Sequence, residues 1–507
     1  MKPLLLTGLF GLVFSEWVGD QHVLQSIPSP IQKSVAIIGG GAAGTSTAFW
    51  LNSVFPKDKI SITLYEKTRL LGGRSTTVAI KDNATAWGMI ELGASIFVEA
   101  NKNLMKATDV FQLKRTDLTS ESKKGRPGLG IWDGKEFLYE ETGTYWDKIT
   151  PIWRYGVLSP LKFQRKQKNV VEQFLKLYDA DHGFENIAKI VEKLQFNELM
   201  NQTAIDYLKH ALGINDRFSF EVLQSATRGN YCQDLNQLHA FALMVSMEAG
   251  NGVWAVEDGN FRIFEEFAYR SGADIQLETE VTAIFNITEP DEFGNLVRRY
   301  VVETSDGTSQ IFDEVVMATP LASSGINFNF PVTEQHRDYH VVHVTLVAGH
   351  VNYSHFGKEN LDTMPTFVIT TGYPLVQHFE NGSAPFQTFS AHRYLDNGED
   401  VVKIFSSDKL SEEELDELFL NKSWVFHKEW HAFPELHPIT GKNKFPHFIL
   451  KASEDEQEGI IYTGAFENFI STMETQTVSG KNAARLIYDK WCRDRHCQPF
   501  GDGWGSH

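Results

Sequence analysis

The chain has 507 residues, of which 42% are hydrophobic and 22% are charged, and its formal net charge is −18. This length exceeds what one hydrophobic core usually supports, so at least two closely packed domains are expected. The acidic balance argues against a nucleic-acid partner, because binding to phosphates requires clustered basic side chains. One short basic run, from Lys162 to Lys168, is interpreted as the solvated face of a helix.

Residues 1–19 are typical of a cleaved secretory signal peptide. Lys2 precedes an apolar run, 3–14, that is too short to span a bilayer, and Ser15 and Glu16 begin a polar stretch. No later apolar run approaches the length of a transmembrane helix, so no membrane-spanning segment is expected. The sequence therefore predicts entry into the secretory pathway.

Other features agree with that route. The chain contains six Asn-x-Ser/Thr acceptor sequences for N-glycosylation. They lie at Asn83, Asn201, Asn286, Asn352, Asn381 and Asn421. Cys492 and Cys497 could bridge in an oxidising compartment or remain free thiols, and Cys232 is expected to be a buried thiol. No spacing of cysteine and histidine indicates a metal site, so none is predicted.

A glycine-rich turn near the N-terminus is the most informative motif. The β-branched run 35–38 predicts a buried strand, and it leads directly into Gly39-x-Gly41-x-x-Gly44 and then into a helical pattern. In such a turn the first glycine permits the tight bend and the second lets the backbone approach a pyrophosphate. The third lets the helix pack close to the strand. The turn therefore indicates a dinucleotide-binding unit.

The residues that follow the turn support this interpretation. Ala42 and Ala43 stand in the first helical turn, where free N–H groups can bind phosphate. A second predicted strand, 60–65, ends at Glu66, 22 residues after Gly44. A carboxylate at that spacing can accept hydrogen bonds from an adenosine ribose.

A second glycine pair shows which dinucleotide is expected. Lys67 follows Glu66, and Gly72-Gly73-Arg74 comes soon after, an extension that a plain NAD dehydrogenase does not need. It resembles the extension of flavoproteins in the glutathione-reductase-2 and amine-oxidase class, whose cofactor is FAD. Arg74 offers a rigid guanidinium fork near the phosphates or the flavin. The residues expected to contact FAD are Gly39, Gly41, Ala42, Ala43, Gly44, Glu66, Lys67, Gly73, Arg74, Gly93, Ala94, Val281 and Gly464.

The predicted fold is α/β, with a Rossmann-type FAD-binding domain interleaved with a mixed α+β substrate domain. The FAD-binding domain is expected to be discontinuous, because strand patterns return near 281–285, 312–320 and 459–465. We assign 33–110, 251–320 and 456–490 to the FAD-binding domain, 111–250 and 321–455 to the substrate domain, and 491–507 to a C-terminal tail.

Three later motifs together resemble one family. They run from Asn251 to Asn260, from Trp430 to Leu436, and from Gly464 to Glu474. The chain resembles the prenylcysteine oxidases, also called prenylcysteine lyases, over nearly all of its length after the signal segment. The resemblance implies an FAD-dependent thioether oxidase in a lysosome-like or vacuolar compartment, or a secreted one, that takes part in the breakdown of prenylated proteins.

The resemblance also implies the reaction. Farnesylcysteine or geranylgeranylcysteine would lose a hydride from the carbon bonded to sulfur to the flavin N5 atom. Water would then add, and the product would collapse to free cysteine and a prenyl aldehyde. O₂ would reoxidise the flavin and form H₂O₂. The cofactor supplies this chemistry, so the protein must chiefly orient the substrate and control water.

A prenyl chain requires a long apolar slot. Trp254, Phe433, Phe466 and Phe469 are candidates to line it, although each could equally be a core residue. The lipid-like substrate also leaves open a peripheral contact with membrane lipid.

Three side chains are candidates for catalysis. His431 could transfer a proton to the departing thiol or bind the amino-acid end, or it could be purely structural. Glu257 and Glu474 could assist the attack of water or hold the substrate ammonium. Glu474 could instead cap the closing helix, because it lies in its first turn.

Two alternatives remain open at this point. A flavin amine oxidase acting on monoamines, polyamines or L-amino acids would share every FAD feature from Gly39 to Arg74. The region around Trp430 and Phe466, however, lacks the "Gly-Trp" and "Tyr-Pro-Gly" sequences typical of that class. The second alternative is an FAD-containing carrier or interaction protein without turnover.

Overall fold

The computed structural model describes residues 32–118, 126–141, 152–180, 182–291, 293–332, 337–375, 384–441, 445–452, 458–493, 497 and 499–504. The predicted signal peptide, 1–19, and the glycosylation candidate Asn381 lie outside the described residues.

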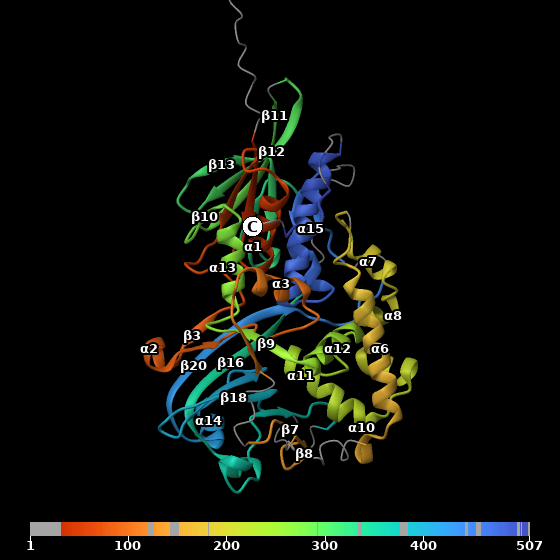
Figure 1. Ribbon diagram of the computed structural model, residues 1–507, viewed down its shortest axis with the longest axis vertical. Helices are drawn as coiled ribbons and strands as arrows, with labels where there is room; N and C mark the ends of the chain where they lie inside the picture. Colours follow the sequence, from red (N-terminus) through yellow and green to blue (C-terminus); the bar gives the residue numbers. More distant parts are fainter. Residues whose placement is uncertain are drawn as a thin grey trace, which may run out of the picture.

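A six-stranded sheet of the Rossmann type occupies one end of the molecule (Figure 1). Its strands, in spatial order, are β10 (Asp274–Gln276), β2 (Ile60–Tyr65), β1 (Lys33–Ile38), β14 (Glu314–Met317), β22 (Ile460–Tyr462) and β21 (Ile449–Leu450). All neighbours pair in parallel except β21, which pairs antiparallel with β22. The last four residues of β1 are all buried, as a parallel strand covered on both faces requires.

Three helices cover this sheet. α1 (Ala42–Val54) begins directly after the glycine turn and packs against α15 (Met473–Cys492) and α13 (Phe261–Arg270). The Rossmann-type α/β fold predicted from the sequence is thus confirmed. The edge strand β21 belongs to this sheet, although the sequence analysis assigned its residues, within 321–455, to the substrate domain.

A small mixed sheet, with two antiparallel strand pairs and one parallel pair, lies beside the Rossmann sheet. It contains β13 (Ser309–Phe312), β12 (Leu296–Thr304), β11 (Val281–Pro290) and β15 (Asn327–Phe328). Two smaller sheets join the FAD-binding unit to the rest of the chain. They are built from β3 (Thr77–Ala79) and β4 (Met89–Glu91), and from β5 (Phe97–Val98), β9 (Val253–Val256) and β6 (Arg115–Asp117).

A seven-stranded sheet forms the other end of the molecule (Figure 1). Its spatial order is β20 (Phe419–Pro434), β16 (Tyr339–Val351), β19 (Asp400–Ser406), β18 (Thr388–Tyr394), β17 (Phe367–Thr370), β7 (Leu129–Trp132) and β8 (Phe137–Glu140). The two predicted insertions therefore share one sheet, because β7 and β8 come from the first insertion and the other strands from the second. α14 (Glu412–Leu418) packs against β20.

A group of helices stands beside this sheet and below α15 (Figure 1). It contains α6 (Leu158–Leu175), α7 (Ile187–Lys193), α8 (Asn197–Asn201), α9 (Ala204–Asp206), α10 (Asp216–Phe218), α11 (Gln224–Tyr231) and α12 (Ala240–Ser246). In α6 the buried residues Ser159, Phe163, Gln167 and Val170 recur at helical spacing and so define one inner face. One continuous core links these helices to the Rossmann sheet.

Three remaining features complete the fold. Cys492 and Cys497 form a disulfide, whereas Cys232 is a buried free thiol. α2 (Ala84–Trp87) and α3 (Lys102–Val110) lie between the strands of the first FAD-binding segment. Within the described parts of the chain, no helix has the length and apolar character needed to cross a bilayer.

Candidate active site

A large cavity lies between the Rossmann sheet, the seven-stranded sheet and the helices. Its volume is ≈ 2790 Å³. A typical small-molecule pocket measures about 300–1,000 Å³, so this cavity has room for a dinucleotide and a second ligand together. Its lining runs from the glycine turn before α1 to α6, α11 and α12.

The glycine turn forms one end of the cavity, lined by Gly39, Gly41, Ala42 and Ala43. Gly41 is the N-cap of α1 and offers no side-chain cap, so the N–H groups of the first helical turn stay available to a ligand. A Cβ added to Gly41 would meet only the Gly73 Cα atom, at 3.8 Å. The space in front of Gly41 thus belongs to the cavity and fits a pyrophosphate.

Gly44 has a different role, since it does not line the cavity. A Cβ on Gly44 would lie 1.9 Å from the carbonyl oxygen of Gly39. Gly39 itself has φ +111, a conformation that favours glycine, and a Cβ there would approach the Ala318 carbonyl to 2.8 Å. These two glycines permit the close contact of strand β1 and helix α1 that shapes this end of the cavity.

Glu66 and Lys67 line the cavity beside the glycine turn. The Glu66 carboxylate accepts hydrogen bonds from the N–H of Gly40, at 2.8 Å, and from the N–H of Thr68, at 2.9 Å. It therefore holds the glycine turn in place. The Thr68 hydroxyl also donates to Oε1, at 2.8 Å, so Oε2 is the oxygen that keeps a lone pair for a ribose hydroxyl.

Arg74 lines the cavity but is also held by the protein. Its guanidinium forms an ion pair with the buried Glu467 carboxylate and donates to the carbonyl of Ala432 at 2.6 Å. The Tyr339 hydroxyl donates to the same carboxylate at 2.6 Å. Gly73 precedes Arg74 and lines the cavity next to Gly41, whose Cα atom a Cβ on Gly73 would approach to 3.2 Å. Because Glu467 balances its charge, the fixed guanidinium contributes oriented N–H groups, and not a net charge, to the cofactor end of the cavity.

Gly93 and Ala94 line the cavity next to a buried lysine that the sequence analysis did not single out. Lys403, on β19, donates to the Ser95 hydroxyl at 2.5 Å and to the Gly93 carbonyl at 3.3 Å. Burial lowers the pKa of Lys403, although the charge of Glu91 opposes that shift. The sequence signal was present, because Lys403 interrupts the apolar run 401–405.

Besides Gly44, two other predicted cofactor residues lie away from the cavity lining. Val281 is buried at the start of β11, where it pairs with Thr304. Gly464 packs against the Tyr462 ring, which a Cβ would approach to 2.5 Å. The cavity is lined instead by 318–320, after β14, and by 471–476, at the start of α15. Both segments follow the carboxyl ends of Rossmann strands, where ligands of open α/β sheets bind.

The four residues predicted to line a slot for the prenyl chain also differ in whether they reach the cavity. Phe433 lines the cavity, whereas Phe466 and Phe469 are fully buried behind its wall. Phe469 stacks on Phe241, with ring centroids 4.7 Å apart. Trp254 lies on β9 outside the lining, under the Arg115 guanidinium. Of the four candidates, Phe433 therefore faces the space available to a substrate.

The apolar wall of the cavity comes chiefly from helices and strands that sequence reasoning did not connect. It includes Val170, Val171, Phe174 and Leu175 of α6, Phe241 and Met244 of α12, Val342 and Val344 of β16, and Phe367 and Ile369 of β17. These residues are far apart in the sequence, and only the packing of helices on the sheet brings them together.

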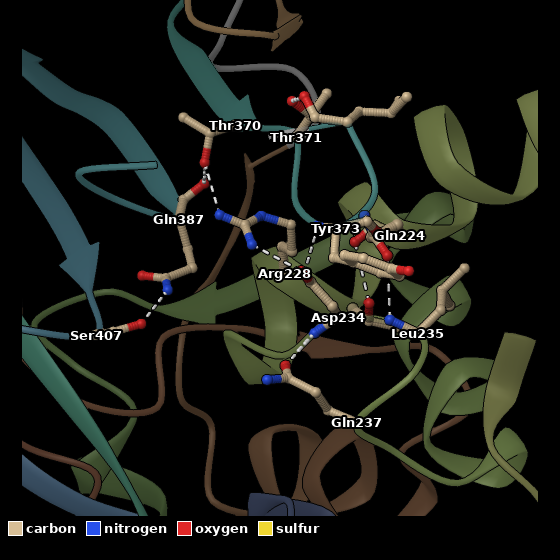
Figure 2. A network of polar contacts seen from close by, with 12 residues as sticks. Gln224, Arg228, Asp234, Leu235, Gln237, Thr370, Thr371, Tyr373, Gln387 and Ser407 are labelled. Carbon is tan, nitrogen blue, oxygen red and sulfur yellow. Dashed lines mark hydrogen bonds and ion pairs between the residues drawn. The ribbon is translucent and has the colours of Figure 1, made fainter. Parts of the chain in front are cut away.

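A polar network fixes α11, one of these wall helices, to β17. Figure 2 shows Arg228, which donates to Asp234 at 2.7 Å and to the Thr370 hydroxyl at 2.8 Å. The other Asp234 oxygen accepts the N–H of Tyr373 at 2.7 Å, and the Gln224 side chain donates to the Tyr373 carbonyl at 2.9 Å. Buried, hydrogen-bonded charges of this kind set the spacing between the two elements.

The candidate catalytic residues occupy three different settings. His431 lies on β20, lines the cavity and has a side chain that is 67% exposed, 3.8 Å from the Glu429 carboxylate. Glu257 forms an ion pair with Lys114 at 2.6 Å and does not line the cavity. The structure thus brings His431, but not Glu257, to the cavity.

Glu474 lines the cavity and is buried, and its carboxylate binds a different helix from its own. It accepts the N–H groups of Asn103 at 2.8 Å and Leu104 at 2.9 Å, at the start of α3, and the hydroxyl of Tyr178. Burial raises the pKa of Glu474 to about 7, against the effect of these donors. The contacts make Glu474 a link between α15 and α3.

Comparison with solved structures shows the fold alone. A triple mutant of putrescine oxidase matches with a TM-score of 0.58 and 14% identity, covering 90% of this chain and 99% of that one. Cyclohexylamine oxidase from Brevibacterium oxydans matches with a TM-score of 0.58 and 15% identity, covering 91% of this chain and 100% of that one.

Sequence comparison identifies the family. Farnesylcysteine lyase of Arabidopsis thaliana is 29% identical over 90% of this chain and 88% of its own length. Human prenylcysteine oxidase 1 is 29% identical over 96% of this chain and 94% of its own length. A sequence model described as an NAD(P)-binding Rossmann-like domain matches residues 37–111. The model described as prenylcysteine lyase matches residues 138–498, and the chain belongs to the prenylcysteine lyase family.

Proposed function

We propose that this protein is an FAD-dependent oxidase that cleaves the thioether of farnesylcysteine or geranylgeranylcysteine during the breakdown of prenylated proteins. Thioether, O₂ and water would give free cysteine, a prenyl aldehyde and H₂O₂. Family membership supports this reaction, as do relatives named farnesylcysteine lyase and prenylcysteine oxidase 1. The observation that carries the proposal is a cavity with two joined parts. One part, which we call the cradle, is lined by the glycine turn, Glu66 and Arg74 and can hold a dinucleotide. The other, which we call the chamber, is lined by the apolar side chains of α6, α12, β16 and β17.

The residues of the cradle fit FAD. Gly41, Ala42 and Ala43 would hold the pyrophosphate, and Glu66 the adenosine ribose. When bound, FAD supplies the hydride acceptor and the site that reacts with O₂. Contacts with Glu467 and Ala432 hold the Arg74 guanidinium in place, and the packing of α1 holds the helix N-terminus, so both groups need little reorganisation to bind the cofactor.

The chamber would orient the substrate through its prenyl chain. Its apolar lining removes the chain from water, and that burial anchors the thioether carbon at a constant distance from the cradle. The titratable groups that line the cavity include His431, Lys403 and Glu474. We keep His431 as the candidate for proton transfer to the departing thiol, because it is the accessible member of the three.

A flavin amine oxidase remains the competing enzyme, because the solved structures with this fold include two amine oxidases. That likeness concerns the fold, and one fold hosts many chemistries. Amines therefore serve as the comparison substrates in the test below. The third hypothesis is a carrier without turnover. It predicts a protein that binds a prenyl ligand, but whose flavin is not reduced by that ligand.

The remaining proposals concern processing. We propose that residues 1–19 direct the chain into the secretory pathway, towards a lysosome, a vacuole or the exterior. Glycans would then attach at sequons whose asparagine is accessible.

The test is anaerobic mixing of the purified holoprotein with farnesylcysteine while the flavin absorbance is followed. Bleaching of the oxidised flavin, followed by H₂O₂ and free cysteine once air is admitted, is the expected result. Putrescine, benzylamine and L-amino acids should leave the flavin oxidised. Bleaching by an amine but not by farnesylcysteine would establish an amine oxidase. A flavin that no substrate reduces would favour the carrier.

A further inference from the structure

An apolar surface lies where the chain enters α6. It consists of Ile152, Trp153, Val157, Leu158 and Leu161, which we call the α6 patch. Five of the fifteen large hydrophobic side chains exposed in the described part of the chain fall within these ten residues. Trp153 is 86% exposed and Leu158 is 74% exposed. Contiguous apolar surface of this kind marks a binding site for a protein or a membrane.

The patch faces outwards because the opposite side of the same segment is firmly packed. Tyr155, Ser159 and Phe163 are buried there. The Asn215 side chain donates to the Tyr155 carbonyl at 3.0 Å and to the Ser159 hydroxyl at 2.9 Å, and the Tyr155 ring meets the Phe218 ring at 5.8 Å. The exposed side chains therefore cannot turn inwards without breaking this packing.

Basic residues continue the outer face of the helix. Lys162, Arg165 and Lys168 follow Leu158 by four, seven and ten residues, so they lie on the same side of α6 as Leu158 and Leu161. All three are exposed, and none forms an ion pair with a described residue. The protein as a whole has a net charge of −18, so a local basic surface next to exposed apolar groups is selective for an anionic partner.

The same helix reaches the cavity. Val170, Val171, Phe174 and Leu175 line the apolar chamber, and ten residues separate Leu161 from Val171. At 1.5 Å per residue this corresponds to about 15 Å along the helix axis. Figure 1 shows α6 extending through the helical part of the molecule, with α10 beside its lower end. A ligand that leaves a bilayer at the patch is therefore close to the chamber.

We propose that the α6 patch docks this protein on a bilayer surface that contains anionic phospholipid. The apolar side chains enter the boundary between headgroups and acyl chains, and Lys162, Arg165 and Lys168 bind the headgroup charge. Delivery of a prenyl chain from the bilayer to the chamber rests on the proposed function, whereas the docking itself does not.

Vesicle binding tests the docking. The holoprotein is floated with phosphatidylcholine vesicles and with vesicles that also contain phosphatidylserine, and we expect binding chiefly to the second. The apolar variant W153S/L158S/L161S and the charge variant K162Q/R165Q/K168Q should each bind roughly tenfold more weakly or worse. The matched control is F293S/L296S on the β11–β12 hairpin, because Phe293 is 81% and Leu296 is 74% exposed. That control should bind as tightly as the parent protein.

Several outcomes would overturn the proposal. They are absence of binding by the parent protein, equal loss in the hairpin control, or binding that ignores the patch variants. A parent protein that is dimeric by light scattering, and becomes monomeric only in the apolar variant, would instead make the patch an interface between two copies.

Turnover separates this proposal from the proposed function. The patch variants should oxidise detergent-dispersed farnesylcysteine as fast as the parent, but oxidise vesicle-embedded farnesylcysteine several-fold more slowly. Patch-dependent vesicle binding without any turnover by the parent would refute the function and leave the docking intact. Full turnover on vesicles by variants that no longer bind them would refute the delivery route.

Discussion

At the scale of single residues, the glycine turn shows that neighbouring glycines serve different purposes. Gly41 faces the cavity, and a Cβ there would meet only the Gly73 Cα atom at ordinary contact distance. Gly44 faces the strand, and a Cβ there would overlap the Gly39 carbonyl oxygen. One glycine therefore leaves room for the ligand, and the other leaves room for the fold.

Substitution by alanine should separate these two roles. Gly41→Ala is expected to fold normally but to lose FAD affinity by roughly tenfold or more, since its methyl group displaces phosphate from charge-assisted hydrogen bonds. Gly44→Ala is expected to destabilise the protein by about 2 kcal/mol or more through overpacking, although alanine favours a helix. Flavin absorbance after gel filtration and thermal unfolding report the two effects. Equal loss of stability in both variants would contradict this division.

At the scale of elements, Glu474 links the start of α15 to the start of α3. Its carboxylate accepts two backbone N–H groups of α3, so it compensates for donors that lack partners within that helix. The link is sensitive to pH, because burial raises the pKa of Glu474 from an ordinary value of 4.5 to about 7. The folded protein thus binds a proton more tightly here than the unfolded chain.

This shift has a defined sign. The group contributes most to stability when it is protonated, below about pH 4.5, and that contribution is lost as pH rises to about 7. Compared with the parent, Glu474→Gln should therefore gain up to about 3 kcal/mol of unfolding free energy between pH 5 and pH 8. Taking the difference between the two proteins cancels the titration of all other groups. Denaturant unfolding at both pH values measures it.

A second variant checks the cause of this pH dependence. Tyr178→Phe removes a hydroxyl that lowers the pKa of Glu474. The decline in stability with rising pH should consequently be larger in Tyr178→Phe than in the parent. An unfolding free energy whose pH dependence is the same in all three proteins would show that Glu474 does not titrate in this range.

The wall helix α11 offers a test of chain-length selection. Gly229 lines the cavity, and a Cβ there would lie 3.4 Å from the Ile369 side chain, an ordinary contact. Gly229→Leu should narrow the chamber and lower kcat/KM for geranylgeranylcysteine about tenfold more than for farnesylcysteine. Gly229→Ala is the matched control and should leave both values nearly unchanged. Equal losses for both substrates would place Gly229 away from the end of the prenyl chain.

At the scale of the whole molecule, the cavity depends on how the two interleaved parts are assembled. The Rossmann sheet supplies the cradle, while the seven-stranded sheet and the helices supply the apolar chamber. One continuous core joins the Rossmann sheet to the helices, so the two halves of the site are held in constant relation.

Entry into the secretory pathway predicts which asparagines on the surface of the protein carry glycans. Asn83 and Asn201 are exposed, whereas the Asn352 amide donates to the Glu417 carbonyl at 2.8 Å and is partly buried. Produced in a eukaryotic secretory host, the protein should lose mass on endoglycosidase treatment. N83Q and N201Q should each remove one glycan, and N352Q should remove none. Intact-mass spectrometry measures the result, and an unchanged mass in every variant would contradict secretory processing at these positions.

The sequence by itself determined the cofactor-binding fold, because its requirements are local. The strand 35–38, the turn Gly39-x-Gly41-x-x-Gly44 and the acidic Glu66 lie within about thirty consecutive residues, and steric limits on strand, turn and helix dictate their arrangement. The apolar strand and the three glycines of the turn are all compatible with a single backbone arrangement. The three later motifs added the family resemblance in the same way, as short patterns that can be read directly.

Tertiary structure alone decided which residues face the cavity. Phe433, Phe466 and Phe469 are equivalent by composition, yet packing places the first on the lining and the other two in the core. The surroundings of Lys403 and of α6 come from strand register and from packed helices. These bring together residues far apart in the chain: 308 positions for Lys403 and Ser95, and 60 for Asn215 and Tyr155. Burial is a property of neighbours in space, and long-range contacts of that kind leave no mark in a local pattern.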